Sequence, residues 1–146
     1  MNSKAFEFGY DEPSVFVVGV NGSDTSWRAL YYAFGLGRRQ HCTVIAVFAM
    51  THPAAQDTTM VGGYEANSGL AAELKPAIQA LATDYQVKTR FMCLPGDPVS
   101  TLIDIAAEHR ADGIFVGASQ GFGRRLFGSN AVRTVRRGHC PVTVVP

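Results

Sequence analysis

Five short apolar runs, separated by longer segments with helical periodicity, limit the possible folds of this sequence more than any other feature. The runs lie at residues 14–20, 43–49, 87–93, 113–118 and 141–145. Four of them are nearly continuous in apolar residues, which is typical of strands buried on both faces. In the run 87–93 apolar residues alternate with Lys88 and Arg90, which predicts an edge strand with one face in water.

The first two helices are each predicted from one apolar stripe. The turn-forming residues 21–24 precede the first helix and can cap it, and Arg38-Arg39 suit the negative end of its dipole. Residues 50–67 are mostly small or polar and predict a mobile loop before the second helix. The stripe of the first helix is Trp27, Leu30, Tyr31 and Phe34, and that of the second is Leu70, Leu74, Ala77, Ile78 and Leu81, with Pro76 as a kink site.

The last two helices are shorter, and both follow a predicted strand. Asp97 is expected to cap the third helix and Pro98 to be its first residue, and the fourth helix is expected over residues 130–137. Five strands separated by four helices predict a doubly wound parallel α/β sheet with helices on both faces. The side chains expected to point inward are Val99, Leu102, Ile103, Ala106 and Ala107 on the third helix, and Val132 and Val135 on the fourth.

Length and composition exclude several classes of protein. The chain has 146 residues, enough for one domain, and its 47% of hydrophobic residues exclude wholesale disorder. A net charge of +1 favours neither nucleic acid nor an anionic membrane as a partner, and no apolar run reaches the ~18 residues that span a bilayer. Three scattered cysteines, and an N-terminus without the layout of a signal peptide, predict a cytoplasmic domain over residues 14–146 after a mobile arm at 1–13.

Two loops that follow predicted strands have compositions suited to a ligand. One is 20–23, and the other is 117–129, which contains four glycines and the pair Arg124-Arg125. Glycines let a backbone approach a ligand closely, and Gly128-Ser129 directly precedes the last helix, whose dipole favours an anion. Such loops follow the carboxyl ends of strands, where α/β sheets bind ligands. A flexible surface loop has the same composition, and spacing alone leaves both interpretations open.

Other candidate chemistry is weaker. His41-Cys42 and His139-Cys140 precede strands, so they are expected at the opposite edge of the sheet, without the clustering that a metal needs. Asp24 is interpreted as an acid that favours the positive end of a helix dipole. The sequence has no GxSxG, HExxH or GxxxxGK[ST] motif, which excludes the familiar hydrolase, protease and P-loop signatures. We therefore predict neither a metal site nor a catalytic residue.

Three stretches of the chain resemble the universal stress protein family, and together they cover residues 14–146. The resemblance implies a sheet of order 3-2-1-4-5, as in the adenine nucleotide alpha hydrolase fold, and a homodimer joined through the last strand. One branch of the family binds ATP with a divalent metal, and the other binds no nucleotide. The matching residues are 18–23, Ser26, Ala29-Leu30, Gly96, Pro98, Ile103, Ala106, Glu108, Ala111-Asp112, Val116-Gly117, Gly128-Ser129, Val132, Val135 and 141–145.

The chain departs from the nucleotide-binding branch of the family at two places. That branch carries G-x2-G-x9-G-[ST] after the fourth strand, whereas here Gln120 replaces the second glycine and the loop from Gly117 to Gly128 is two residues shorter. Asn21 stands where the family usually has an aspartate. Its amide can bond a ribose hydroxyl but adds no charge to a metal. Gly117, Gly128 and Ser129 keep the pattern.

The resemblance implies a stress-response regulatory protein that binds ATP or another adenine nucleotide, with or without Mg²⁺. No residue stands out as a general base, so we do not expect an enzyme. Two alternatives are a dimeric interaction module without nucleotide and an adenylating enzyme, although the latter needs a Ser-Gly-Gly loop where this chain has 21–23. The implied contacts are backbone atoms of Val20 and Ala49 to adenine, Asn21 to ribose, and Gly117, Gly121, Gly128, Ser129 and Asn130 to phosphate.

Overall fold

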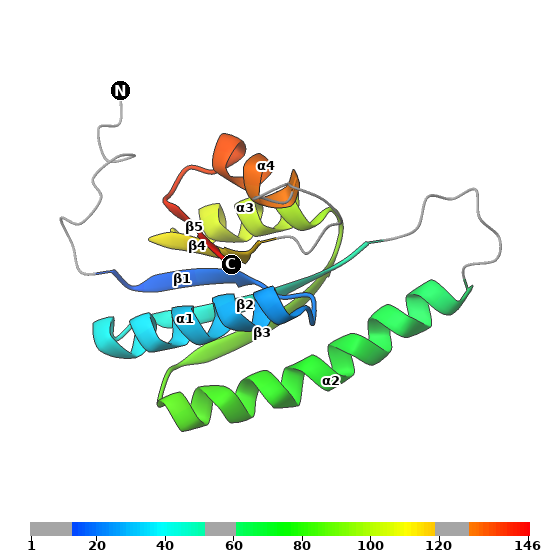
Figure 1. Cartoon of the computed structure of the whole chain (residues 1–146), viewed down its shortest axis with the longest axis horizontal. Coiled ribbons are helices and arrows are strands. Elements are labelled where there is room, and N and C mark those ends of the chain that lie inside the picture. Colours follow the sequence, from blue (N-terminus) through cyan, green and yellow to red (C-terminus); the bar gives the residue numbers. More distant parts are fainter. Residues whose placement is uncertain (1–12, 52–60, 119–128) are drawn as a thin grey trace.

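The chain forms one alternating series of strands and helices (Figure 1). The computed structural model describes residues 13–51, 61–118 and 129–146. The mobile arm predicted at 1–13 falls almost entirely outside the described residues. The elements are β1 (Val15–Gly19), α1 (Asp24–Gln40), β2 (Thr43–Met50), α2 (Val61–Tyr85), β3 (Thr89–Pro95), α3 (Pro98–Glu108), β4 (Gly113–Gly117), α4 (Ser129–Arg137) and β5 (Val142–Val145).

The five strands form one parallel sheet of order β3-β2-β1-β4-β5, as predicted. The chain moves from β1 outward to β3 and then returns to the other side of β1 with β4. Helices α1 and α2 cover one face of the sheet, and α3 and α4 cover the other (Figure 1). The doubly wound fold is therefore confirmed, and its strand order reverses between β1 and β4. In the described parts of the chain no helix is both long and apolar enough to cross a membrane.

Alternate residues of the strands supply two cores, one on each face of the sheet. Phe16 and Val18 of β1 pack with Phe34 of α1 and Ile78 of α2. Val17, which points to the opposite face, packs on the α3 side of the sheet, in the cluster that contains Leu102 and Ile114. Because successive side chains of a strand point to opposite faces, an apolar run without alternation fills both cores at once. This explains why the buried strands were visible in the sequence.

Two helices begin with the caps that the sequence predicts. The Ser23 hydroxyl accepts a hydrogen bond from the Ser26 amide at 3.2 Å, and α1 starts at the next residue, Asp24. Asp97 accepts one from the Ser100 amide at 3.0 Å, and Pro98 is the first residue of α3. Both caps satisfy amides that have no partner within their own helix. The caps therefore set where these two helices start.

The loop predicted at residues 50–67 is wrong at both ends. Met50 belongs to β2, and α2 begins at Val61, well before Leu70; residues 52–60 lie outside the described residues. Once Leu74 and Ile78 anchor the helix in the core, each further residue needs only the small free energy of propagation. Pro76 lies inside α2, on the exposed side of the helix. Figure 1 draws α2 as one continuous helix.

The inward face predicted for α4 is wrong. Val132 and Val135 are 37% and 57% exposed, whereas Ala131 and Thr134 are buried. The two buried side chains are small, so α4 can lie close to α3. The Thr134 hydroxyl donates to the Asn130 carbonyl at 2.7 Å, which removes the cost of burying it. In this short helix hydrogen bonding and size decide the buried face more than hydrophobicity does.

Two smaller expectations are also corrected. Ala107 of α3 is exposed, and Ile105 is buried in its place. β3 is an edge strand as predicted, but Met92 and Leu94 are half-buried against the core on the α3 side. Arg90, Met92 and Leu94 share one face of β3, and of these three only Arg90 is exposed. Neither face of the strand is therefore fully exposed to solvent.

Candidate functional site

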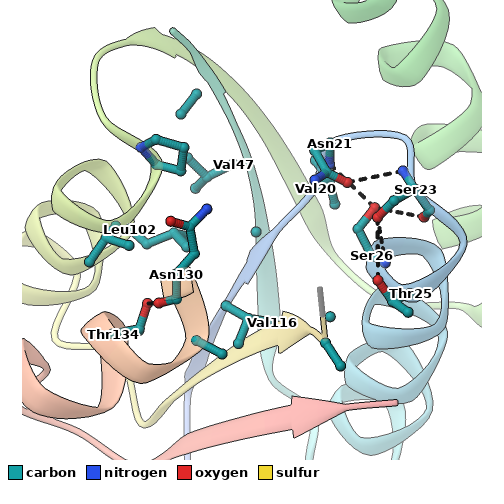
Figure 2. A pocket seen from close by; sticks show the side chains of 17 residues that line it. Val20, Asn21, Ser23, Thr25, Ser26, Val47, Leu102, Val116, Asn130 and Thr134 are labelled. Carbon is teal, nitrogen blue, oxygen red and sulfur yellow. Dashed lines mark hydrogen bonds between the residues drawn. The ribbon is translucent and has the colours of Figure 1, made fainter. Parts of the chain in front are cut away.

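A pocket of about 210 Å³ lies at the carboxyl ends of β1, β2 and β4 (Figure 2). This is the point at which the strand order reverses, so that α1 and α4, the helices that follow β1 and β4, lie on opposite faces of the sheet and leave a crevice between them. The strands contribute largely apolar walls. The lining residues at the strand ends are Gly19, Val20, Val47, Ala49, Val116 and Gly117.

The amino-terminal ends of three helices meet at this pocket. Each helix contributes residues from its first turn or its cap. The lining residues are Ser23, Thr25 and Ser26 from α1 and its cap, Pro98 and Val99 from α3, and Asn130 and Ala131 from α4. The first amides of a helix point outward without helical partners, and the helix dipole adds a partial positive charge. Among the described residues that line the pocket, none has an ionisable side chain. Among these described lining residues, the positive potential therefore comes from backbone groups rather than from lysine or arginine side chains.

Hydrogen bonds within the β1–α1 loop hold Asn21 in place. Its side-chain oxygen accepts from the Ser23 backbone amide at 3.0 Å, and the backbone amide of Asn21 donates to the Ser26 hydroxyl at 3.3 Å. That hydroxyl also donates to the Ser23 carbonyl at 2.9 Å. Figure 2 shows this group on the side of the pocket opposite Asn130. Because the Asn21 oxygen is engaged, the side chain offers a ligand its NH₂ group as a donor.

Gly117 is required for packing as well as for the shape of the pocket. A Cβ at this position would lie 2.5 Å from the carbonyl carbon of Thr25 and 2.7 Å from the amide nitrogen of Ser26. Only glycine lets the end of β4 approach the first turn of α1 so closely. This contact gives Gly117 a structural role in addition to the phosphate contact implied by the family resemblance.

The structure brings together five of the residues predicted for the site: Val20, Asn21, Ala49, Gly117 and Asn130 all line the pocket. Gly121 and Gly128 lie outside the described residues, as do Arg124 and Arg125, and Ser129 is the first residue of α4. The Val20 amide donates to the Val47 carbonyl at 2.9 Å, so this N–H is already used within the sheet.

Sequence reasoning missed the contribution of α3. Pro98, Val99 and Leu102 line the pocket although α3 follows β3, the strand at the far edge. The available signal was the Asp97-Pro98 helix start, which directly follows the carboxyl end of a strand. All such starts lie at one edge of a parallel sheet, but the sequence does not show that α3 packs against β1 and β2.

An ion pair joins α3 to α4 beside the pocket. The Arg133 guanidinium donates to both oxygens of Asp97 at 3.1 Å, and Arg137 donates to the Ser100 hydroxyl at 3.1 Å. The Ser100 amide and the Arg133 guanidinium stabilise the charged carboxylate and lower the pKa of Asp97 to about 2. Asp97 is therefore fully ionised at neutral pH.

The cysteines lie away from the pocket. Cys42 directly precedes β2 and Cys140 lies two residues before β5, at the amino edge of the sheet, and Cys93 lies within β3; all three are free. Burial is the main cause that raises the pKa of each thiol, which favours its neutral form. Within 13–51, 61–118 and 129–146 no three His, Cys, Asp or Glu side chains are grouped so that they could hold a metal ion.

A doubly wound sheet with a pocket at its order reversal defines a class of ligand-binding α/β domains. The sequence model of the universal stress protein family matches residues 14–146, so the chain belongs to this family. A universal stress protein of Methanocaldococcus jannaschii is 28% identical over 135 residues, which cover 88% of this chain and 79% of that protein.

Solved structures of the family have the same fold. The universal stress protein UspA from Lactobacillus plantarum has a TM-score of 0.80 at 22% identity and covers 93% of this chain and 99% of its own. A universal stress protein in complex with cAMP has a TM-score of 0.74 at 24% identity, with the same coverage of 93% and 99%. Two more distant structures hold AMP, from Arabidopsis thaliana (TM-score 0.69, 16% identity, 91% of both chains), and dAMP, from Archaeoglobus fulgidus (TM-score 0.64, 19% identity, 93% and 100%).

Proposed function

We propose that this chain is a regulatory protein that binds an adenine nucleotide in the pocket between β1 and β4. The observation that carries the proposal is the meeting of three helix amino termini beside apolar strand ends. Such a site suits a ligand with one anionic end and one flat apolar end, because the positive ends of the helix dipoles favour phosphate and the aliphatic side chains contact a base. The relatives solved with cAMP, AMP and dAMP all hold ligands of this kind.

In this proposal each part of the nucleotide meets a different wall. The adenine lies against Val20 and Ala49, and the Asn21 NH₂ group donates to a ribose hydroxyl. The phosphate lies at the amino terminus of α4, near Ser129 and Asn130. The residues proposed from the loop, Gly121 and Gly128, complete the phosphate site. ATP and the monophosphates share the adenosine and the first phosphate, so both classes are candidate ligands.

The proposed role is binding rather than catalysis. The described residues that line the pocket include no carboxylate, imidazole or amine that could act as a general base. They also include no carboxylate for Mg²⁺, so a divalent metal would be held through the nucleotide and water. We propose a cytoplasmic location from the sparse cysteines, all of which are free.

The proposed assembly is a homodimer joined through β5. This strand lies at the edge of the described sheet, and its four residues are each half-buried. The Ile114 amide donates to the Pro141 carbonyl and the Ala118 amide to the Val145 carbonyl, so alternate β5 residues face β4. Val142 and Val144 then direct their backbone groups to the open edge. A second copy of the strand would satisfy them.

A dimeric interaction module without nucleotide is the second candidate. Asn21 favours it, because the family's usual aspartate would offer a ligand a charged acceptor, whereas the side-chain oxygen of Asn21 is neutral and already accepts from the Ser23 amide. In this case the β5 edge carries the function and the pocket stays empty.

Titration calorimetry with AMP and ATP distinguishes the two candidates. We expect wild-type protein to bind at least one of them, and Ala49→Leu to weaken binding because the larger side chain fills the pocket. Ala72→Leu makes the same change on an exposed face of α2 and should bind as wild type does. Absence of heat with either nucleotide, supported by equilibrium dialysis, would favour the interaction module.

A further inference from the structure

The ion pair between Asp97 and Arg133 flanks the pocket on two of its helices. Asp97 directly precedes Pro98 and Val99, which line the pocket, and Arg133 directly precedes Thr134, which also lines it. Both side chains remain about half exposed, so neither is buried as part of a core. Neither side chain lines the pocket itself, so the pair would act on the charge of a ligand through space.

The position of Asp97 creates an electrostatic conflict. As the N-cap of α3 its carboxylate stabilises the helix. The same negative charge lies beside a pocket whose helix ends favour an anion, and it opposes the binding of a phosphate. Asp97 keeps this charge at neutral pH, since its pKa is about 2. A cation beside Asp97 would offset this repulsion and favour the binding of a phosphorylated ligand.

Arg133 supplies that cation with suitable geometry. Its guanidinium contacts both carboxylate oxygens at 3.1 Å, the bidentate arrangement in which arginine pairs best with a carboxylate. The arginine comes from α4, the helix whose amino terminus faces the pocket. We infer that Arg133 tunes ligand specificity: by neutralising Asp97 it raises the affinity of the pocket for a phosphorylated ligand and leaves the affinity for an uncharged nucleoside unchanged.

This inference rests on the proposed function. It differs from a purely structural role of the pair in the direction in which two substitutions change the affinity for a phosphorylated ligand. A structural clamp between α3 and α4 would be weakened by loss of either partner, so both losses would lower affinity. Under charge control, Arg133→Gln lowers affinity for a phosphorylated ligand and Asp97→Asn raises it. Asparagine also caps helices well, so Asp97→Asn keeps the start of α3.

The effect must also scale with the charge of the ligand. Adenosine is neutral, AMP carries about two negative charges, and ATP carries more. A charge within about one Debye length of the phosphate changes AMP affinity by about two- to fivefold, and ATP affinity by more. Adenosine affinity should not change. The double variant Asp97→Asn/Arg133→Gln removes both charges and should return close to wild-type affinity.

Calorimetric titration of adenosine, AMP and ATP into these variants tests the inference. Arg136→Gln and Asp104→Asn are matched controls, because they remove one charge each from exposed positions of α4 and α3 outside the pair. We expect opposite shifts for the two single variants and much smaller shifts for the controls. Shifts of the same sign, or an equal effect on adenosine, would overturn the inference and leave nucleotide binding intact. Wild-type protein that binds none of the three ligands would overturn the proposed function and this inference together.

Discussion

Replacement of Gly117 by alanine tests the close packing of β4 on α1. The added Cβ would lie 2.5 Å from the Thr25 carbonyl carbon and 2.6 Å from its oxygen, whereas ordinary contacts begin at 3.4 Å. The two elements must therefore separate locally by nearly 1 Å. The opposing atoms are backbone in the first turn of α1, which the Ser23 cap holds, so no flexible side chain can move aside.

We expect this substitution to lower the free energy of unfolding. Overpacking of a tight contact costs about 1–3 kcal/mol. Alanine also lowers the conformational entropy of the unfolded chain, which offsets about 0.4–1 kcal/mol of this destabilisation. The net destabilisation should be about 1–2 kcal/mol, which corresponds to a fall of several degrees in the unfolding midpoint.

Urea denaturation followed by the fluorescence of Trp27, the single tryptophan of the chain, measures this difference. Gly69→Ala is the matched control, because it makes the same chemical change in α2 where a Cβ meets nothing within 4 Å. It should stabilise the protein by about 0.5–1 kcal/mol through helix propensity. Equal stability of wild type and Gly117→Ala would refute the close contact, as would parallel changes in the two variants.

Three further predictions concern assembly, metal and pH. Val144→Pro should convert the proposed dimer to a folded monomer, because it removes a hydrogen-bond donor at the open edge of β5 and leaves the hydrogen bonds to β4 intact. Sedimentation measures the mass and circular dichroism the fold. A dimer that persists would exclude β5 as the interface. EDTA should lower nucleotide affinity only modestly, since the described pocket residues include no carboxylate; complete dependence on Mg²⁺ in the same titration would contradict this, with Asp24 as the first residue to test. The lowered pKa of Asp97 contributes stability above its unfolded value of 3.8, and this is lost as pH falls toward about 2. Asp97→Asn should therefore lose less stability than wild type between those pH values in urea titrations, and equal losses would show that the ionised carboxylate contributes nothing through its bonds to the Ser100 amide and Arg133.

The strands could be anticipated because each buried run supplies side chains to both cores, whereas their order was implied by the family resemblance. Phe16, Val17 and Val18 are consecutive and apolar, and no alternating pattern would fill two opposite faces. The caps of α1 and α3 were equally visible, since Ser23 and Asp97 act within their own turn of chain. Features determined by neighbouring residues are therefore the ones that sequence reasoning recovers.

Features determined by tertiary contact were missed. The buried face of α4 depends on how closely it approaches α3, which favours Ala131 and Thr134 over Val132 and Val135. The packing role of Gly117 likewise depends on the first turn of α1, more than 90 residues away in sequence. The candidate site was located from the strand ends, but the part that α3 plays in it required the structure.

The uncharged lining of the pocket limits how pH can affect the proposed site. The described lining residues have no side chain that exchanges a proton near neutral pH, and the only ionisable residues of the sequence 119–128 are arginines, which stay charged. Occupancy of the proposed site would then depend on hydrogen-ion concentration only through the ligand's own phosphate, whose second pKa is about 6. A change in pH would then alter nucleotide binding by protonating the ligand and not the described lining of the pocket.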